Sequence, residues 1–439
     1  MFDIISLSTG GLIVTSIVIF TVLLCLKRFE IAIFMMLFSP LIPAFLLPNN
    51  GAAVGQEGTG IGSFIRVSIV LLVGGVGFLQ FIKSRKLSEE RLPNHFYFLA
   101  LFLLLALVST CYSLDQEYTA IASLSFIAFY FFLLGLNYWL DRERNLNITL
   151  NVCFFGILLC LVVNALSLVI LPEKAWWFAA ENRFQGLFGH PNSIGAFCMG
   201  SYPVLLWKYW ECKSREKYGV ICLILMCFSL HFLSGSRTTL FASAFGIVIW
   251  LVLLKKKKQL MIFSATVLCL LFILLGDAYS PSALTREEGS NLSHLTGRPE
   301  IWKAAVILAR ERPILGYGYS VGGKIFEDDR FYNKYAPMFR GNRRVSLHNG
   351  YLSVFIGVGF IGLSIFCISL FLPLWKSFHA PACAYKAFVI TMMSIALLAN
   401  CFESSIAGGK SIDSVVLWIA WVIGGRMIKA DSVLDNGFN

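Results

Sequence analysis

The sequence predicts an all-α polytopic integral membrane protein with about 12–13 transmembrane helices and one large, partly helical extracytoplasmic loop. Hydrophobic residues make up 57% of the 439-residue chain and charged residues only 14%, whereas soluble domains average about 25% charged residues. The apolar residues also fall into runs of about 17–25, the length that crosses a bilayer as a helix.

These runs give thirteen candidate spans, or twelve if an early one is re-entrant or merged with its neighbour. The candidate spans lie at about 9–26, 31–48, 64–82, 96–113, 119–140, 148–171, 191–210, 218–234, 239–254, 259–276, 348–374, 384–401 and 412–428. The first run lacks a basic preceding region and a small-residue cleavage site. We therefore expect it to remain as a span instead of being removed as a signal peptide.

The distribution of Lys and Arg predicts the orientation of the spans. One alternate set of short connections carries most of the basic residues, including the runs KSRKLSEER and KKKK. The positive-inside rule makes this set cytoplasmic, together with the C-terminus. The other short connections carry only Arg66, Lys174, Arg183, Arg237 and Lys410. The net charge of +11 is thus explained by topology, and we expect no nucleic-acid partner.

The predicted outer segment 277–347 is too long for the positive-inside rule, which applies to short loops. It divides the chain into an N-terminal transmembrane bundle (1–276), an extracytoplasmic catalytic loop (277–347) and C-terminal transmembrane helices with a short cytoplasmic tail (348–439). Within the loop, GRPEIWKAAVILARERP predicts an amphipathic helix, with Ile301, Ala305 and Leu308 on one side, that ends at Pro313. We expect the loop to form a small soluble subdomain that carries function.

Arg237 is the most informative single residue. It lies in SGSRTTL between two apolar segments, and a charged residue inside a membrane protein is a candidate functional residue because its burial is costly. Its planar guanidinium suits phosphate oxygens. The alternative is an arginine whose charged end reaches the headgroup level.

His348 begins a predicted span, in RRVSLHNGYL. A histidine can accept a proton from a sugar hydroxyl near neutral pH, although it can also simply cap the start of a helix. The preceding Arg343 and Arg344, with Arg340, form a basic group suited to phosphate or to lipid headgroups. With these basic residues beside it, a functional role for His348 is favoured over a role as a simple helix cap.

Four further residues lie on the same predicted side. His190, with Asn192, stands at a span entrance, where it serves either as a helix-start turn or as a ligand contact. Arg298 follows Gly297 at a helix start, where backbone N–H groups attract anions; capping by Thr296 competes with that interpretation. Glu403 could orient His348, pair with Arg237 or pair with Lys410.

We found no metal or cofactor motif. The 12 cysteines show no CxxC or Cys/His spacing, and most lie in apolar runs, where Cys behaves as a small hydrophobic residue. GYGYSVGG is neither a P-loop nor a dinucleotide fingerprint. The acids of FEDDRF are adjacent and do not face one another as ligands. WWF at 176–178 predicts an interfacial aromatic belt or a surface helix, with stacking against sugar rings as a further alternative. GVGFIG at 357–362 predicts helix packing through small residues.

The order of these motifs resembles the O-antigen ligase and O-antigen/exopolysaccharide polymerase superfamily. The matching segments are GHPNSIGAF, SGSRTTL, LTGRPEIWKAA, GYGYSVGG and HNGYLSVFIGVGFIGL, which together cover roughly residues 183–365. The resemblance implies a metal-independent membrane glycosyltransferase that uses a polyprenyl-diphosphate-linked glycan on the outer face of the bacterial inner membrane.

The resemblance also implies roles for individual residues. His348 and Arg237 match the family's catalytic histidine and essential arginine. Arg298 or the pair Arg343/Arg344 matches a basic residue of the large loop, so Arg237, Arg298, Arg343 and Arg344 are the candidate diphosphate ligands. We assign supporting or acceptor-binding roles to five residues: His190, Asn192, Asn349, Tyr351 and Glu403.

The acceptor separates two possible activities. A polymerase extends a second lipid-linked repeat unit, with a chain-length regulator as an expected partner, and a ligase transfers the glycan to lipid A-core; the motifs slightly favour the polymerase. A transporter or flippase of lipid-linked sugars is a third possibility. It is disfavoured because such proteins carry polar residues at mid-span, whereas the polar set here lies on one face.

Overall fold

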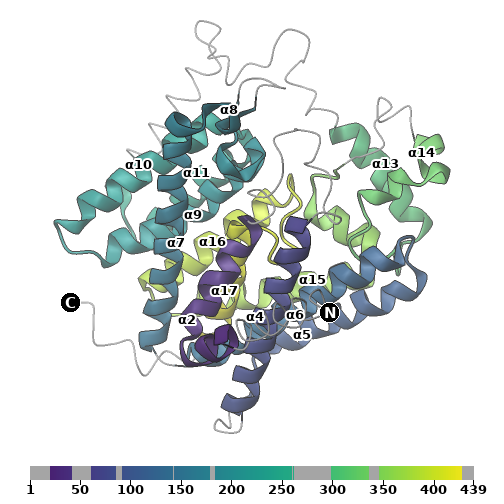
Figure 1. Cartoon of the computed structure of the whole chain (residues 1–439), viewed down its shortest axis with the longest axis horizontal. Coiled ribbons are helices and arrows are strands. Elements are labelled where there is room, and N and C mark those ends of the chain that lie inside the picture. Colours follow the sequence, from purple (N-terminus) through teal and green to yellow (C-terminus); the bar gives the residue numbers. More distant parts are fainter. Residues whose placement is uncertain are drawn as a thin grey trace, which may run out of the picture.

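The computed structural model describes residues 20–41, 61–85, 91–141, 143–177, 183–259, 261, 298–335 and 346–427. Most of the predicted spans 9–26 and 259–276 lies outside these ranges, as do Thr296, Arg340, Arg343, Arg344 and the predicted C-terminal tail. The described chain is almost entirely helical, which confirms the predicted all-α class (Figure 1).

The described helices follow the predicted spans closely. Their bounds are α2 (Phe29–Phe38), η1 (Ser39–Leu41), α4 (Ile61–Arg85), α5 (Asn94–Val108), η2 (Ser109–Tyr112), α6 (Gln116–Trp139), α7 (Glu143–Ile170), α8 (Pro172–Ala175), η3 (Gly186–Phe188), α9 (Pro191–Glu211), α10 (Glu216–Ser234), α11 (Arg237–Leu253), α13 (Arg298–Glu311), η4 (Lys324–Glu327), α14 (Asp329–Tyr335), α15 (Gly350–His379), α16 (Ala384–Ala399) and α17 (Ile412–Arg426). Among the described residues, six helices are long and apolar enough to cross a membrane: α4, α5 with η2, α6, α7, α10 and α15.

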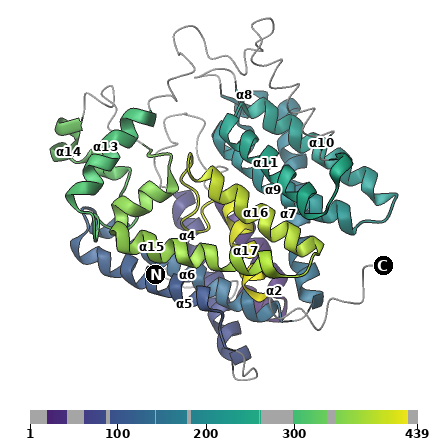
Figure 2. The same ribbon diagram turned by 180° about the vertical axis from the view of Figure 1, so that it is seen from behind.

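The centre of the bundle is α17. Every residue from Ile412 to Gly425 is buried, and the helix packs against α15, α16, α9 and α6. Figure 2 shows α15 and α16 crossing in front of it. A helix that is buried on all sides is surrounded by other helices, so the short helix α17 is the core around which the longer helices are arranged.

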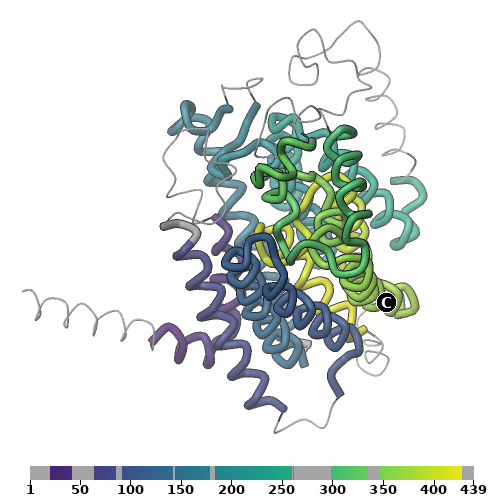
Figure 3. The backbone as a smooth tube through the Cα atoms, turned by 90° about the vertical axis from the view of Figure 1, so that its right-hand side faces the viewer, coloured from purple at the N-terminus to yellow at the C-terminus, as the bar shows by residue number. Residues whose placement is uncertain are grey.

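The outer loop has a core of its own. Ala304, Ala305 and Leu308 of α13 are buried against Tyr317 and Phe326, which confirms the predicted amphipathic helix. This loop subdomain, residues 298–335, lies beside the C-terminal end of α5 and the N-terminal end of α6 (Figure 3). Polar contacts fix it there: Lys324 pairs with Asp115 at 3.0 Å, and the hydroxyl of Thr119 donates to the carbonyl of Tyr319 at 3.0 Å.

The GVGFIG segment is a kink, so our prediction of helix packing through small residues was wrong for its centre. Helix α15 is interrupted at Val358 and Gly359, where Gly359 has φ 67° and ψ −170°, a conformation that only glycine adopts readily. The carbonyls of Ile356 and Gly357 instead accept the N–H groups of Tyr317 and Gly318, at 2.9 and 2.8 Å. The loop subdomain thus satisfies backbone groups that the broken helix leaves open.

Candidate functional site

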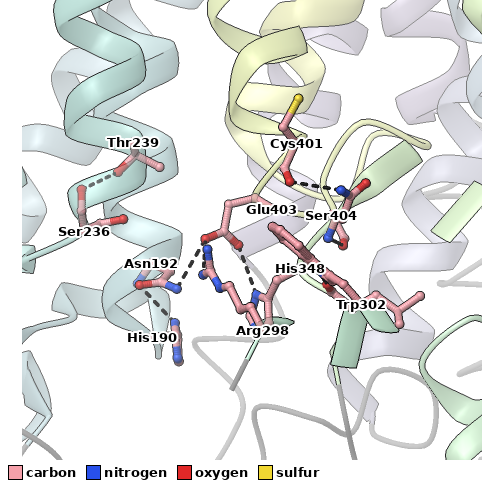
Figure 4. Close-up of polar contacts among 12 residues, drawn as sticks. His190, Asn192, Ser236, Thr239, Arg298, Trp302, His348, Cys401, Glu403 and Ser404 are labelled. Carbon is pink, nitrogen blue, oxygen red and sulfur yellow. Dashed lines mark hydrogen bonds and ion pairs between the residues drawn. The ribbon is translucent and has the colours of Figure 1, made fainter. Parts of the chain in front are cut away.

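The centre of the site is the carboxylate of Glu403, in the loop between α16 and α17. Its Oε1 lies 3.2 Å from the guanidinium of Arg298, and its Oε2 lies 3.4 Å from Nδ1 of His348. The side chains of Glu403 and Arg298 are only 17% and 11% exposed. Figure 4 shows the three residues converging from α16–α17, α13 and the start of α15. The structure therefore brings together three of the predicted residues from distant parts of the chain.

A fourth predicted residue, Asn192, reaches the same carboxylate from α9. Its side-chain amide donates to Oε1 of Glu403 at the longer distance of 3.5 Å. The amide oxygen accepts a hydrogen bond from Arg183 at 2.9 Å, and Arg183 also donates to the carbonyl of Ser234 at 2.8 Å. Because the amide oxygen of Asn192 already accepts a hydrogen bond from Arg183, the amide NH2 group is the part that faces Glu403.

His348 is held in an unusual backbone conformation. Its φ is 45°, in the left-handed region that residues with a β-carbon rarely occupy and that is enriched at functional sites. The next residue, Asn349, is the N-cap of α15, and its side chain accepts from the N–H of Leu352 at 2.9 Å. His348 therefore directly precedes the N-cap residue of α15, and the capping hydrogen bond of Asn349 stabilises the start of that helix.

Asn349 also joins α15 to the loop that carries Glu403. Its side chain donates to the carbonyl of Cys401 at 3.1 Å, and its N–H donates to the hydroxyl of Ser404 at 3.0 Å. Tyr351 donates its hydroxyl to the carbonyl of Leu397 at 2.9 Å. These bonds fix the Glu403 loop relative to His348, so the geometry favours the supporting role for Asn349 and Tyr351.

Arg298 is placed by the first turn of α13. Trp302, one turn further on, donates its indole N–H to the carbonyl of Leu347 at 2.8 Å, directly before His348. The helix that carries Arg298 is thereby tied to the segment that carries His348. A sequence-based search missed Trp302, although its position one turn after Arg298 on an amphipathic helix was a usable signal.

His190 serves as the N-cap of α9, with Pro191 in the first turn. Its Nδ1 accepts the N–H of Asn192 at 3.1 Å, which requires the unprotonated nitrogen. Burial and the nearby Arg183 lower the pKa of His190 to about 4, so the ring is neutral at physiological pH. The helix-start interpretation thus holds, and the cap simultaneously orders Asn192.

Trp177 contacts the ring of His190 edge-on, with the ring centroids 5.3 Å apart. Trp176 and Trp177 form the short strand β1 (Trp176–Trp177), which pairs antiparallel with β2 (Arg183–Phe184). Of the alternatives for this segment, the surface helix is therefore wrong, and the interfacial aromatic belt and stacking against sugar rings stay predictions. The pairing of β1 with β2 places Arg183 near the start of α9, where it contacts Asn192. Arg183 is therefore part of the candidate site, although the sequence analysis used it only to predict topology.

Arg237 is the first residue of α11 and its side chain is exposed. This exposure leaves both interpretations of the arginine open, and the residue lies at a helix end on the predicted outer side. Gly195 of α9 lets the start of α11 approach closely, since a β-carbon there would lie 2.5 Å from the side chain of Ser236. Arg237 thus stands beside the first turn of α9, where Asn192 lies.

The acids of FEDDRF do not face one another. Glu327 ends η4, Asp329 begins α14, and Asp328 pairs with Arg330 at 2.6 Å. Within the part of the chain that the structure describes, no group of three or more His, Cys, Asp or Glu side chains could hold a metal ion. The metal-independent reaction stays a prediction.

Comparison with known proteins shows which family this chain resembles. Residues 221–367 match the family model described as O-antigen ligase. The O-antigen ligase of Pseudomonas aeruginosa is 29% identical over 215 residues, which are 48% of this chain and 48% of that protein. The chain is thus similar to the O-antigen ligase superfamily over residues 221–367, which are less than half of its length. It spans about half the length of the curated relative it matches.

The O-antigen ligase match includes part of the site. Arg237, Arg298 and His348 lie within the matched residues, whereas His190, Asn192 and Glu403 lie outside them. The six described helices that are long and apolar enough to cross a membrane make this a multi-pass membrane protein. The contacts of Glu403 with Arg298 and His348 connect residues inside the matched region with residues beyond it.

Proposed function

We propose that this protein transfers a glycan from a polyprenyl diphosphate carrier to an acceptor sugar hydroxyl, without a metal ion, on the outer face of the bacterial inner membrane. The contact between His348 and Glu403 at 3.4 Å, beside Arg298, is the observation that carries the proposal. A histidine oriented by a carboxylate is a general base of known type, and an arginine beside it suits a diphosphate leaving group.

His348 acts as the base through its other ring nitrogen. The carboxylate of Glu403 accepts the Nδ1–H, which leaves the lone pair of Nε2 for the acceptor hydroxyl. The acceptor oxygen attacks the anomeric carbon of the donor while His348 takes its proton. The bond from that carbon to the diphosphate oxygen breaks, and polyprenyl diphosphate leaves with the bonding electrons.

The arginines stabilise the leaving group. Negative charge develops on the diphosphate as the bond breaks, and fixed cations in a partly dry site stabilise that charge in the transition state. Arg298, held by Glu403, is the inner cation, and the exposed Arg237 is the cation at the start of α11. Arg343 and Arg344 remain candidates for the same role.

The acceptor is best assigned as lipid A-core, because the relative from Pseudomonas aeruginosa is named an O-antigen ligase. The sequence motifs had favoured the polymerase, and a second lipid-linked repeat unit remains the second candidate acceptor. The two activities share the donor and the mechanism described above, so the site geometry supports both equally.

The test uses purified protein in phospholipid vesicles containing a chelator and a polyprenyl-diphosphate-linked glycan. Either lipid A-core or a second lipid-linked repeat is supplied as the acceptor. We expect transfer to one acceptor, loss of transfer in His348→Ala, and full transfer in His379→Ala, which changes an exposed histidine of α15 far along the helix. Full transfer by His348→Ala, or no transfer to either acceptor, would refute the proposal.

A further inference from the structure

The turn that follows α13 exposes two large apolar side chains. Pro313 ends the helix, and the next residues, Ile314 and Leu315, are 60% and 46% exposed. Gly316 and Tyr317, which follow directly, are buried in the core of the loop subdomain. In a subdomain surrounded by water, this arrangement would place adjacent apolar side chains in solvent without compensation.

The depth of this turn follows from its contact with α5. The span from Asn94 to Tyr112 has 19 residues, which at 1.5 Å per residue measures about 28 Å, close to the roughly 30 Å of bilayer hydrocarbon. At its outer end, the hydroxyl of Tyr112 donates to the carbonyl of Leu315 at 2.9 Å. The turn therefore lies at the level where α5 leaves the hydrocarbon.

The turn is also continuous with the exposed surface of α15. The N–H of Phe360 donates to the carbonyl of Pro313 at 2.8 Å, and a β-carbon on Gly359 would lie 2.0 Å from the carbonyl oxygen of Ile314. Phe360 is 65% exposed on a helix long and apolar enough to span the membrane. The partner of such a side chain is lipid, and the same lipid layer extends over Ile314 and Leu315.

Helix α13 adds a second exposed set of the same character. Val306 and Ile307 point away from the buried alanines of the helix, and both are exposed. Lys303 and Arg310 are exposed beside them. Apolar side chains flanked by basic ones are typical of helices that lie in the headgroup region.

We infer that residues 313–316, here called the anchor turn, and the exposed face of α13 insert into the outer leaflet of the membrane. The occupant of this surface is phospholipid: acyl chains contact Ile314 and Leu315, and headgroups contact Lys303 and Arg310. The anchor turn fixes the depth of α13, whose first residue is Arg298. The loop subdomain is thus a membrane-seated element and differs in this respect from the soluble subdomain expected from the sequence.

Photo-crosslinking tests this directly in the full-length protein. Benzoylphenylalanine replaces Ile314 in one sample, the lipid-facing Phe360 in a second, and Arg330, on the exposed surface of α14, in a third. Each protein is placed in vesicles of phosphatidylethanolamine and phosphatidylglycerol, irradiated and analysed by mass spectrometry. The readout needs no catalytic activity, so it is independent of the proposed function.

We expect phospholipid adducts at positions 314 and 360 at similar yield, and at least tenfold fewer at position 330. A yield at position 314 as low as that at position 330 would overturn the inference. Crosslinking of position 314 mainly to a second copy of the chain would also overturn it, because the surface would then be a protein interface.

Discussion

The substitution Glu403→Gln tests the site most sharply, because it keeps the size of the side chain and removes only its charge. The carboxylate lies 3.2 Å from Arg298 and 3.4 Å from His348. At an effective dielectric constant of about 20, the unit-charge pair with Arg298 would be worth about 5 kcal/mol before desolvation. Desolvation reduces this, and a charge-assisted hydrogen bond contributes about 1.5–3 kcal/mol net.

That range corresponds to a loss of about 10- to 150-fold in rate. The loss should appear mainly in kcat, because His348 loses the acceptor for its Nδ1–H and becomes a weaker, less oriented base. The assay is glycan transfer in vesicles across a range of donor concentrations. The matched control is Asp328→Asn, which removes a carboxylate from an exposed arginine pair in the loop subdomain. Unchanged kcat and KM in Glu403→Gln would refute the assigned role of this carboxylate.

Three further predictions concern the surroundings of the site. Arg298→Lys should lower transfer by about tenfold or more, because a lysine loses the planar fork, whereas Arg330→Lys should leave it unchanged; equal rates would contradict the diphosphate role. Burial lowers the pKa of His190 from 6.5 to about 4, so as pH falls through this window the unfolded state binds a proton that the native state does not. The wild-type Tm should therefore drop more between pH 7 and pH 5 than that of His190→Gln, and parallel curves would count against this. Gly359→Ala should lower the free energy of unfolding by about 1–3 kcal/mol. Its Tm should be lower than that of the control Gly75→Ala, whose added β-carbon meets no atom within 4 Å. Matching Tm values would mean that the kink tolerates a side chain.

The spans and the amphipathic helix α13 could be predicted from the sequence because hydropathy acts locally. Runs of apolar residues must cross the bilayer as helices, and α4 to α7, α9 to α11 and α15 to α17 each follow a predicted run to within about five residues. The kink of α15 was missed since it depends on a distant segment. Its open carbonyls are satisfied by Tyr317 and Gly318, and no local pattern reports that pairing.

Three residues of the candidate site could be named from the sequence as candidates, whereas Trp302 and the contacts of Arg183 could not, and neither could the pairing of the three. His348, Arg298 and Glu403 stood out as polar residues at the outer ends of apolar segments. The sequence left three partners open for Glu403, namely His348, Arg237 and Lys410, and its ion pair with Arg298 was not among them. In the sequence, 55 residues separate Glu403 from His348, so no local pattern indicates which partner is correct. The choice depends on the loop after α16, which Asn349 holds through Cys401 and Ser404. Such a contact follows from tertiary packing alone.

The most direct test of the central claim is a single-turnover measurement of the release of polyprenyl diphosphate. Donor bound to excess protein in vesicles is mixed with acceptor, and both the released carrier and the transferred glycan are followed in time. We predict that the wild-type protein releases carrier only when acceptor is present, and that His348→Ala binds donor normally but releases carrier at least about 100-fold more slowly. Carrier release by His348→Ala at the wild-type rate would contradict the account.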